Sequence, residues 1–287
     1  MTGKTVKVLF QEANDNFTQG NYRQVEKICR LVLKEKPHII EFQKLLEETR
    51  NRLCQLTYIE NKSQFSPLIA INIQPNQPIP IYFDTIPKFN ICLFDFTGEN
   101  YLPNLPYPIT YYFSQKTEGK GEIMQILSEK LPQNFSYYGF IDHDIFLSVS
   151  DINKMLFIAE VFNLDLFQPS LSLDSYVNFS HLFHNTGYLI KETNFVEVMM
   201  PFFSNYGYLK SKEFFYESIS GWGIDFVFSH KLFEAKRKIA IIHDVIAGHK
   251  KPVASINWVL SNGMTPHHEL HNIKNKYNLH NFYDQMF

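Results

Sequence analysis

Cysteine is scarce in this sequence, and the C-x-x-C spacing is absent. The three cysteines, Cys29, Cys54 and Cys92, lie far apart along the 287 residues. Isolated cysteines of this kind are typical of free thiols in a reducing compartment rather than of a disulfide framework. We therefore expect a cytoplasmic protein.

Long apolar runs and a strong excess of charge of one sign are also missing. No run approaches the roughly 18 apolar residues of a membrane-spanning helix, and the N-terminus lacks the charged-then-apolar pattern of a signal peptide. We expect no transmembrane segment, although attachment to a membrane surface through a partner protein stays open. The formal net charge of -2 argues against a nucleic-acid binder, so any phosphate must be bound at a local site.

Several common catalytic and nucleotide-binding motifs do not occur. The sequence has no G-x-S-x-G, no G-x-x-x-x-G-K and no G-x-G-x-x-G, which mark serine hydrolases, phosphate loops and dinucleotide-binding sites. A zinc helix of the H-E-x-x-H type is also excluded. Its second histidine, counted from His268, would stand at position 272, which is Asn272.

Apolar and aromatic residues, in contrast, are plentiful. Hydrophobic residues make up 45% of the chain, with 27 Phe and 16 Tyr, so a full core is expected. A chain of this length holds one large domain, or one medium and one small domain. Changes in composition predict a helical segment at 1–56, an α/β domain at 57–264 and a polar tail at 265–287.

Residues 5–55 have helical periodicity and no strand pattern. Gly20 allows a tight turn between two helices, Ala13 lets the paired helix approach closely, and Pro37 ends the second helix. This α-helical hairpin resembles a tetratricopeptide repeat, whose period is about 34 residues, although an ordinary hairpin would have the same shape. A single repeat cannot bury both of its faces, so we expect it to pack on the rest of the chain, on a protein partner or on a second copy.

From residue 57 onward, short apolar runs alternate with segments of helical periodicity. This rhythm predicts an α/β domain with a largely parallel sheet flanked by helices. The expected strands are 68–73, 79–83, 89–98, 109–113, a strand ending at 141, and 238–243; the expected helices are 122–131, 152–162 and 226–232.

Two aspartates, Asp142 and Asp144, follow the buried residues Phe140 and Ile141. If this stretch is a strand, residues i and i+2 point to the same side, so the two carboxylates can converge on one cation. Carboxylate oxygens suit Mg²⁺ or Mn²⁺ better than Zn²⁺. A D-x-D pair also occurs by chance at a strand end or helix cap, but Ser150 and Asp151 already serve as caps for the next helix.

Seven segments, by their order and spacing, resemble those of GT-A glycosyltransferases. They are most similar to those of the glycosyltransferase family catalogued as domain of unknown function 707. The resemblance implies a GT-A-like mixed sheet with a nucleotide-sugar donor across its carboxyl edge. It also implies a divalent metal, Mn²⁺ or Mg²⁺, on the donor diphosphate. The seven segments are 93–98, 114–124, 139–144, 168–171, 194–204, 221–225 and 243–249.

The same resemblance assigns roles to single residues. Asp142 and Asp144 would bind the metal, with Asp142 also close to the ribose, and His249 would be a third ligand, with His243 as the second choice. The expected donor-binding residues are Asp95, Lys120, Asp142, Gln168 and Trp222. Lys116 and Lys120 precede a helix start, where backbone amides and positive charge can hold a phosphate.

The stretch from Gly221 to Asp225 resembles the glycine-tryptophan-glycine-x-acid loop of inverting galactosyltransferases. The resemblance implies that Asp225 is the base that activates the acceptor hydroxyl and that Trp222 packs against sugar. Alternatively, Asp225 caps a helix and Trp222 lies in the core. Glu197, a carboxylate within an apolar run, is the next candidate for the base.

These patterns together predict a metal-dependent glycosyltransferase that transfers a sugar, with inversion, from a nucleotide-sugar donor to a carbohydrate or glycoconjugate acceptor. Two alternatives stay open. One is a non-catalytic scaffold or binding protein with an inactive transferase fold, and the other is a metal-dependent phosphoesterase that uses the same acids.

Overall fold

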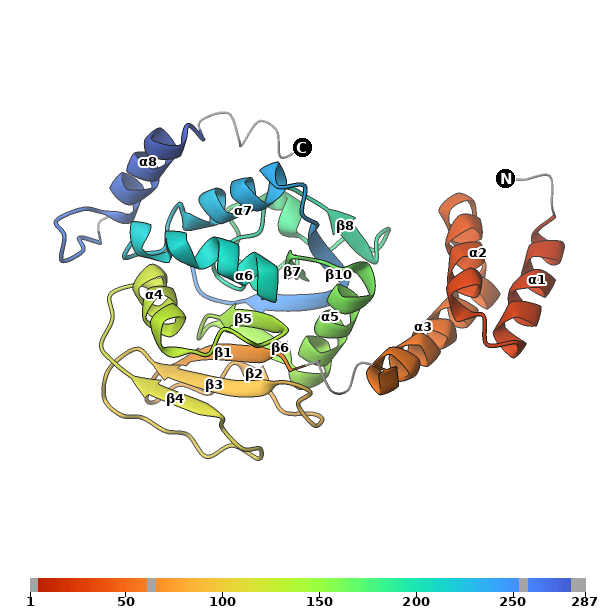
Figure 1. Ribbon diagram of the computed structural model, residues 1–287, viewed down its shortest axis with the longest axis horizontal. Helices are drawn as coiled ribbons and strands as arrows, with labels where there is room; N and C mark the ends of the chain where they lie inside the picture. The colour runs from red at the N-terminus through yellow and green to blue at the C-terminus, as the bar shows by residue number, and fades with distance from the viewer. Residues whose placement is uncertain (1–4, 61–65, 253–257, 280–287) are drawn as a thin grey trace. The chain divides into compact units, whose positions relative to one another are not determined.

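The computed structural model describes residues 5–60, 66–252 and 258–279, with the side chains of 50, 51 and 53–60 left out. The chain divides into two compact units, Met1–Phe65 and Ser66–Phe287 (Figure 1). Within the described residues, no helix is both long and apolar enough to cross a membrane. The side chains of Cys29 and Cys92 are buried, and the side chain of Cys54 lies outside the described part.

The first unit consists of three helices, α1 (Val6–Thr18), α2 (Tyr22–Glu35) and α3 (Ile40–Glu60). Gly20 makes the turn between α1 and α2 with a φ of +78°, a conformation that glycine adopts without strain. Ala13 is fully buried, which lets the two helices approach closely. The helical hairpin expected from the sequence is therefore present, and its likeness to a tetratricopeptide repeat stays a prediction. The core of this unit consists of Leu9, Ala13, Val25, Ile28, Cys29, Val32, Phe42, Leu45 and Leu46.

The second unit is built on a ten-stranded mixed sheet with strand order β2-β6-β10-β7-β9-β5-β1-β3-β4, and β8 pairs with β10. Its apolar strands are buried because helices cover them, as expected for parallel α/β sheets. The strands are β1 (Leu68–Ile73), β2 (Ile81–Tyr82), β3 (Asn90–Asp95), β4 (Tyr111–Ser114), β5 (Tyr137–Ile141), β6 (Ile145–Ser148), β7 (Leu166–Leu171), β8 (Ile190–Glu192), β9 (Phe202–Ser204) and β10 (Ile239–His249).

Strands β5, β1, β3 and β4 pair in parallel, as do β7 and β10. The sheet is mixed because β9 inserts between β5 and β7 antiparallel to both, while β6 and β8 run antiparallel to β10. The run at 195–204, interrupted by Glu197, forms a strand only at its end, and residues 195–201 have no regular structure.

The helices of the second unit begin at polar or glycine residues. Ser148 caps α5 (Val149–Phe162) in a capping box with Asp151, so the cap starts two residues before the expected Ser150. Helix α4 (Lys120–Lys130) starts two residues earlier than the sequence suggested. Figure 1 shows α6 (Asn205–Ser211) beside α7 (Ile224–Glu234), and α8 (Pro266–Tyr277) beside α7.

Candidate functional site

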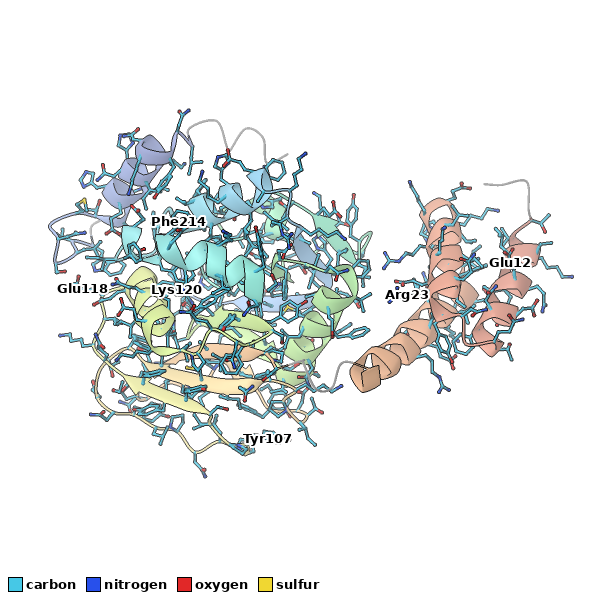
Figure 2. All side chains as sticks on the ribbon, viewed as in Figure 1. Glu12, Arg23, Tyr107, Glu118, Lys120 and Phe214 are labelled. Atoms are coloured by element: carbon cyan, nitrogen blue, oxygen red, sulfur yellow. The ribbon has the colours of Figure 1, made fainter. Side chains whose placement is uncertain are left out.

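A cavity of about 320 Å³ lies at the carboxyl ends of the parallel strands, which is the edge where open α/β sheets bind ligands. This volume suits a small organic ligand. Figure 2 labels Lys120 and Glu118, which lie near each other at the start of α4. The cavity is lined by Asn72, Phe96, Thr117, Glu118, Gly119, Lys120, Ile123, Asp142, His143, Asp144, Asn178, Glu197, Val198, Met199, Ser220, Trp222, His249, Pro252 and Trp258.

The D-x-D pair lies in the turn between β5 and β6, and not within a strand. The amide of Ile145 donates to the carbonyl of Asp142 at 3.2 Å and closes this turn. The strand alternation assumed for Asp142 and Asp144 is therefore wrong here, because a turn does not keep residues i and i+2 on one side. Both acids still line the cavity, and each has different partners.

Asp142 is held by two polar side chains from other elements. Nζ of Lys120 lies 2.6 Å from its Oδ1, and Nδ2 of Asn72 donates to the same oxygen at 2.9 Å. Lys120 also donates to the carbonyl of Phe140 at 3.1 Å. Burial raises the pKa of Asp142 despite the Lys120 charge and lowers the pKa of Lys120 despite the Asp142 charge. In this arrangement the Lys120 ammonium is directed at a carboxylate and not left free for a phosphate.

Asp144 faces His249, the last residue of β10, with 3.7 Å between Oδ2 and Nε2. Nδ1 of His249 lies 2.6 Å from the carbonyl oxygen of Tyr176. Because a carbonyl only accepts, Nδ1 carries a proton, and Nε2 is the nitrogen that faces Asp144: it donates to Asp144 when the ring is protonated and presents a lone pair when the ring is neutral. Burial lowers the pKa of His249, but its hydrogen bonds with Asp144 and Tyr176 outweigh this effect and raise that pKa overall.

A proton or a cation between Oδ2 of Asp144 and Nε2 of His249 stabilises this pair. Fixing one imidazole nitrogen through a backbone carbonyl is also the usual way in which proteins orient a metal-binding histidine. Asp144 and His249 therefore fit a divalent cation. Among the residues that the structure describes, no three His, Cys, Asp or Glu side chains form a ready-made metal group, since Asp142 is turned toward Lys120 and Asn72.

Glu197 is a buried carboxylic acid in the cavity wall. Its Oε1 accepts a hydrogen bond from Asn178 at 3.2 Å, whereas its buried Oε2 has no hydrogen-bond partner among the residues that the structure describes. Burial, reinforced by the charge of Asp225, raises the pKa of Glu197 to about 8. A carboxylic acid that lines a cavity and has a pKa shifted toward neutrality is typical of groups that exchange protons at functional sites.

Asp225, the expected base, lies in the first turn of α7 and does not line the cavity. It is 5% exposed. Its Oδ1 accepts from the backbone amide of Phe226 at 3.0 Å and its Oδ2 from that of Val198 at 3.3 Å. Burial raises its pKa to about 7, although these amides act in the opposite direction. The geometry thus places Asp225 behind the residues around Glu197, as a group that holds α7 against this segment.

Trp222 is half-buried and lines the cavity, so it is not a core tryptophan. Its ring meets that of His267 from α8 edge-on, with 4.9 Å between the centroids. Trp258 lines the same cavity. These are the only two tryptophans of the chain, so both indoles report on one site.

Asp95 and Gln168, two expected donor-binding residues, are fully buried and do not line the cavity. Asp95 accepts hydrogen bonds from Thr97, Tyr101 and Ser114. Burial acts to raise the pKa of Asp95, but these bonds outweigh it and lower that pKa. Oε1 of Gln168 accepts from the amide of Glu197 at 2.7 Å. Both residues support the walls of the site from behind.

His243, the second choice for a metal ligand, also lies away from the cavity. Its Nδ1 accepts from the amide of Asn185 at 3.2 Å. Burial, together with the charges of His184 and Lys191, lowers its pKa to about 4. His243 is therefore a neutral buried histidine near neutral pH.

Sequence reasoning did not identify Asn72, Asn178 or Trp258 as residues of the site. Asn72 carried a usable signal, because it is the one polar residue in the run Leu68–Ile73. Asn178 and Trp258 lie outside helices and strands, where no periodicity points to a cavity.

Comparison with known proteins supports the fold but no closer relationship. No protein-family model and no curated protein sequence matches the chain. The chain is similar to the crystal structure of GalNAc-T7 with UDP, GalNAc and Mn²⁺, at a TM-score of 0.50 and 8% identity, over 75% of this chain and 48% of that one. It is also similar to A197 from STIV, at a TM-score of 0.39 and 15% identity, over 64% of this chain and 85% of that one.

The second unit is thus a mixed α/β sheet flanked by helices with a GT-A-like fold. The chain spans about half the length of GalNAc-T7, because 48% of that chain is covered. The resemblance to the family catalogued as domain of unknown function 707 stays a prediction, since no family model matches.

Proposed function

We propose that the chain is a metal-dependent glycosyltransferase, which moves a sugar from a nucleotide-sugar donor to a carbohydrate or glycoconjugate acceptor. The observation that carries the proposal is the pair of Asp144 and His249, which face each other at 3.7 Å in a cavity at the carboxyl edge of a GT-A-like sheet. Fold alone does not decide function, so the argument rests on this site.

In this proposal Asp144 and His249 hold the divalent cation, and Asp142, which lines the same cavity, joins them only where the cation displaces Lys120. An imidazole ligand favours Mn²⁺ over Mg²⁺. Such a cation stabilises the charge that develops on a departing diphosphate. Its own two positive charges would also reduce the burial cost that Asp142 now offsets through Lys120 and Asn72.

The remaining lining residues suit a nucleotide and a sugar. Asn72 and Asn178 offer amide oxygens that can accept hydrogen bonds from hydroxyls of a ligand. Trp222 and Trp258 offer flat apolar surfaces on which a base or a sugar ring can lie. A mostly apolar wall with a few convergent polar groups is the usual composition of a small-molecule site.

The reaction requires a base on the side of the sugar opposite the diphosphate. The acceptor oxygen forms a bond to the anomeric carbon, the bond from that carbon to the diphosphate oxygen breaks, and the acceptor proton passes to a carboxylate. We assign this carboxylate to Glu197, which lines the cavity. Because burial raises its pKa to about 8, the ionised form that accepts the proton increases as the pH rises toward 8. Asp225, the acid of the loop that resembles galactosyltransferases, would act through the position of Val198. Attack opposite the leaving group inverts the anomeric centre.

Calorimetric titration of the whole chain with UDP and other nucleoside diphosphates, with and without Mn²⁺, tests the proposal. Binding that depends on Mn²⁺, followed by donor hydrolysis in a screen of nucleotide sugars, is the expected result. Absence of binding for every nucleoside diphosphate and nucleotide sugar would overturn it.

A non-catalytic nucleotide-binding protein is the second candidate. The ion pair between Lys120 and Asp142 favours it, because this pair satisfies the first acid of the D-x-D without any metal. Nucleotide binding without hydrolysis or transfer for any donor would support this candidate.

A further inference from the structure

Glu269, a residue of α8, is a buried carboxylate that accepts five hydrogen bonds. It is 2% exposed. Its Oε2 accepts from both the amide and the hydroxyl of Ser220 and from the hydroxyl of Ser218. Its Oε1 accepts from the amide of Ile219 at 2.9 Å and from the side-chain amide of Asn262 at 3.0 Å. The hydrogen bonds from the two serines outweigh burial and lower its pKa, so this carboxylate is charged at neutral pH.

The loop that Glu269 holds forms one wall of the candidate site. The hydroxyl of Ser220 also accepts from the amide of Trp222 at 3.2 Å, so it connects Glu269 to the tryptophan. Ser220 and Trp222 both line the cavity. A second contact from α8 reaches the same indole, since the ring of His267 packs edge-on against it.

The same loop also fixes the start of α4. The carbonyl of Ser220 accepts from the amide of Lys120, and the carbonyl of Ile219 accepts from that of Glu122, both at 3.2 Å. The backbones approach so closely that a Cβ at Gly121 would overlap the carbonyl oxygen of Ser218. Glu269 is therefore connected, through one loop, both to Trp222 and to the lysine that pairs with Asp142.

We propose that Glu269 is a positioning residue, and that α8 works as a latch that holds Trp222 and Lys120 in the geometry that binds the ligand. The acceptor-only chemistry of a carboxylate is essential to this role. Glutamine has the same size, but its NH₂ group would face a backbone amide in either orientation, because Ile219 and Ser220 donate to different oxygens. The effect on ligand binding rests on the proposed function, whereas the effect on Trp222 does not.

The first measurement uses the full chain with Trp258→Phe, so that Trp222 is the only source of tryptophan fluorescence. Adding Glu269→Gln should shift the Trp222 emission to longer wavelength and increase its quenching by acrylamide, in the absence of any ligand. The matched control is Lys276→Gln, which breaks the ion pair of α8 with Glu217 (2.6 Å) and leaves the Glu269 bonds intact. It should leave the emission unchanged.

The second measurement is titration with UDP and Mn²⁺ in the chain that keeps both tryptophans. Glu269→Gln should weaken binding about tenfold or more, and Lys276→Gln should not. If the unaltered chain binds no nucleotide, the proposed function fails. The emission measurement still tests whether Glu269 positions Trp222.

Circular dichroism checks that each variant is folded. If Glu269→Gln does not fold, Ser218→Ala takes its place, since it removes one hydrogen bond to Glu269 and one to the amide of Gly221. An unchanged Trp222 emission in the folded Glu269→Gln or Ser218→Ala protein would overturn the latch. The same shift in Lys276→Gln would also overturn it, because the effect would then belong to α8 as a whole.

Discussion

The ammonium group of Lys120 lies 2.6 Å from the carboxylate of Asp142, so the first acid of the D-x-D already has a cationic partner from the chain itself. A metal that approaches Asp142 must compete with this ammonium. Asp144, in contrast, faces Nε2 of His249 at 3.7 Å, a group that can ligate a metal. The two acids, one residue apart, are therefore not equivalent, and their substitutions should have different effects.

Asp144→Asn should abolish Mn²⁺-dependent binding of UDP while the protein stays folded. Loss of the negative charge weakens one of the two groups that fit a cation, and His249 alone holds Mn²⁺ weakly. Titration calorimetry in the presence and absence of Mn²⁺ measures this. Asp174→Asn is the matched control, because Asp174 is an exposed carboxylate that pairs with Lys250. Retained Mn²⁺ dependence in Asp144→Asn would place the cation elsewhere.

Lys120→Met should lower the free energy of unfolding by about 2 kcal/mol. Removing one partner of a buried ion pair costs roughly 3–5 kcal/mol, and the cost is smaller here because the Asp142 side chain is 24% exposed. Urea denaturation measures the change. Lys116→Met, at an exposed lysine, is the control and should have little effect. Equal stability of the two variants would show that the pair contributes nothing.

Glu197→Gln and Asp225→Asn should separate the two candidate bases. If Glu197 accepts the acceptor proton, Glu197→Gln lowers turnover by roughly 10²–10⁴-fold and leaves donor binding nearly unchanged. Asp225→Asn should have a smaller effect on turnover, because that side chain does not line the cavity. Steady-state kinetics with an identified donor measure both. The reverse order of effects would return the role of base to Asp225.

The stability of the protein should fall as the pH rises toward 8. Burial raises the pKa of Glu197 from 4.5 to about 8 in the folded state. Between these values the folded state holds one more proton than the unfolded state, so the free energy of unfolding decreases with pH. Asp225 and Asp142 raise this pKa further, whereas Asn178 and His249 oppose the shift.

The expected loss from Glu197 alone is on the order of 2 kcal/mol between pH 6 and pH 8, since one pKa unit corresponds to about 1.4 kcal/mol. Denaturation curves at a series of pH values measure it. Glu197→Gln should make the free energy of unfolding depend less on pH and should stabilise the protein at pH 8. An identical pH dependence in the two proteins would contradict the assignment.

Gly121→Ala should destabilise the protein by about 2 kcal/mol, although alanine usually stabilises a helix by up to about 1 kcal/mol relative to glycine. The added Cβ would overlap the carbonyl oxygen of Ser218, which the contacts of Glu269 hold in place. Thermal unfolding measures the change. In the control Gly187→Ala, the Cβ meets only the side chain of Asn185 at 3.2 Å, and a small change is expected.

Local sequence patterns were enough for strands such as β1 and β5 but not for β6, β8 and β9. The apolar run 68–73 forms β1 with the expected bounds, and Asp142, Asp144, Trp222 and His249 all line one cavity because strand and loop ends meet at one edge of the sheet. The D-x-D pattern gave the position of the acids but not their partners, since Lys120 and Asn72 reach Asp142 from other elements.

Other features depend on tertiary contacts that no local pattern contains. Asp225 and Glu197 are both carboxylates in apolar surroundings, and only the packing of α7 shows which one reaches the cavity. Glu269 lies in a polar segment that was expected to be a tail. Its importance becomes visible only when the loop at 218–220 folds back onto it.

The register shift in β10 also determines which side chain faces Asp144. Ile242 pairs with Pro169 and Ile246 with Ser170, so three more residues lie on β10 than on β7 between these pairs. Because side chains alternate along a strand, an odd insertion exchanges the two faces for every residue that follows. Deleting a single residue at this bulge would therefore turn His249 away from Asp144 without altering either residue. The length of the strand, as well as its composition, encodes the chemistry of this site.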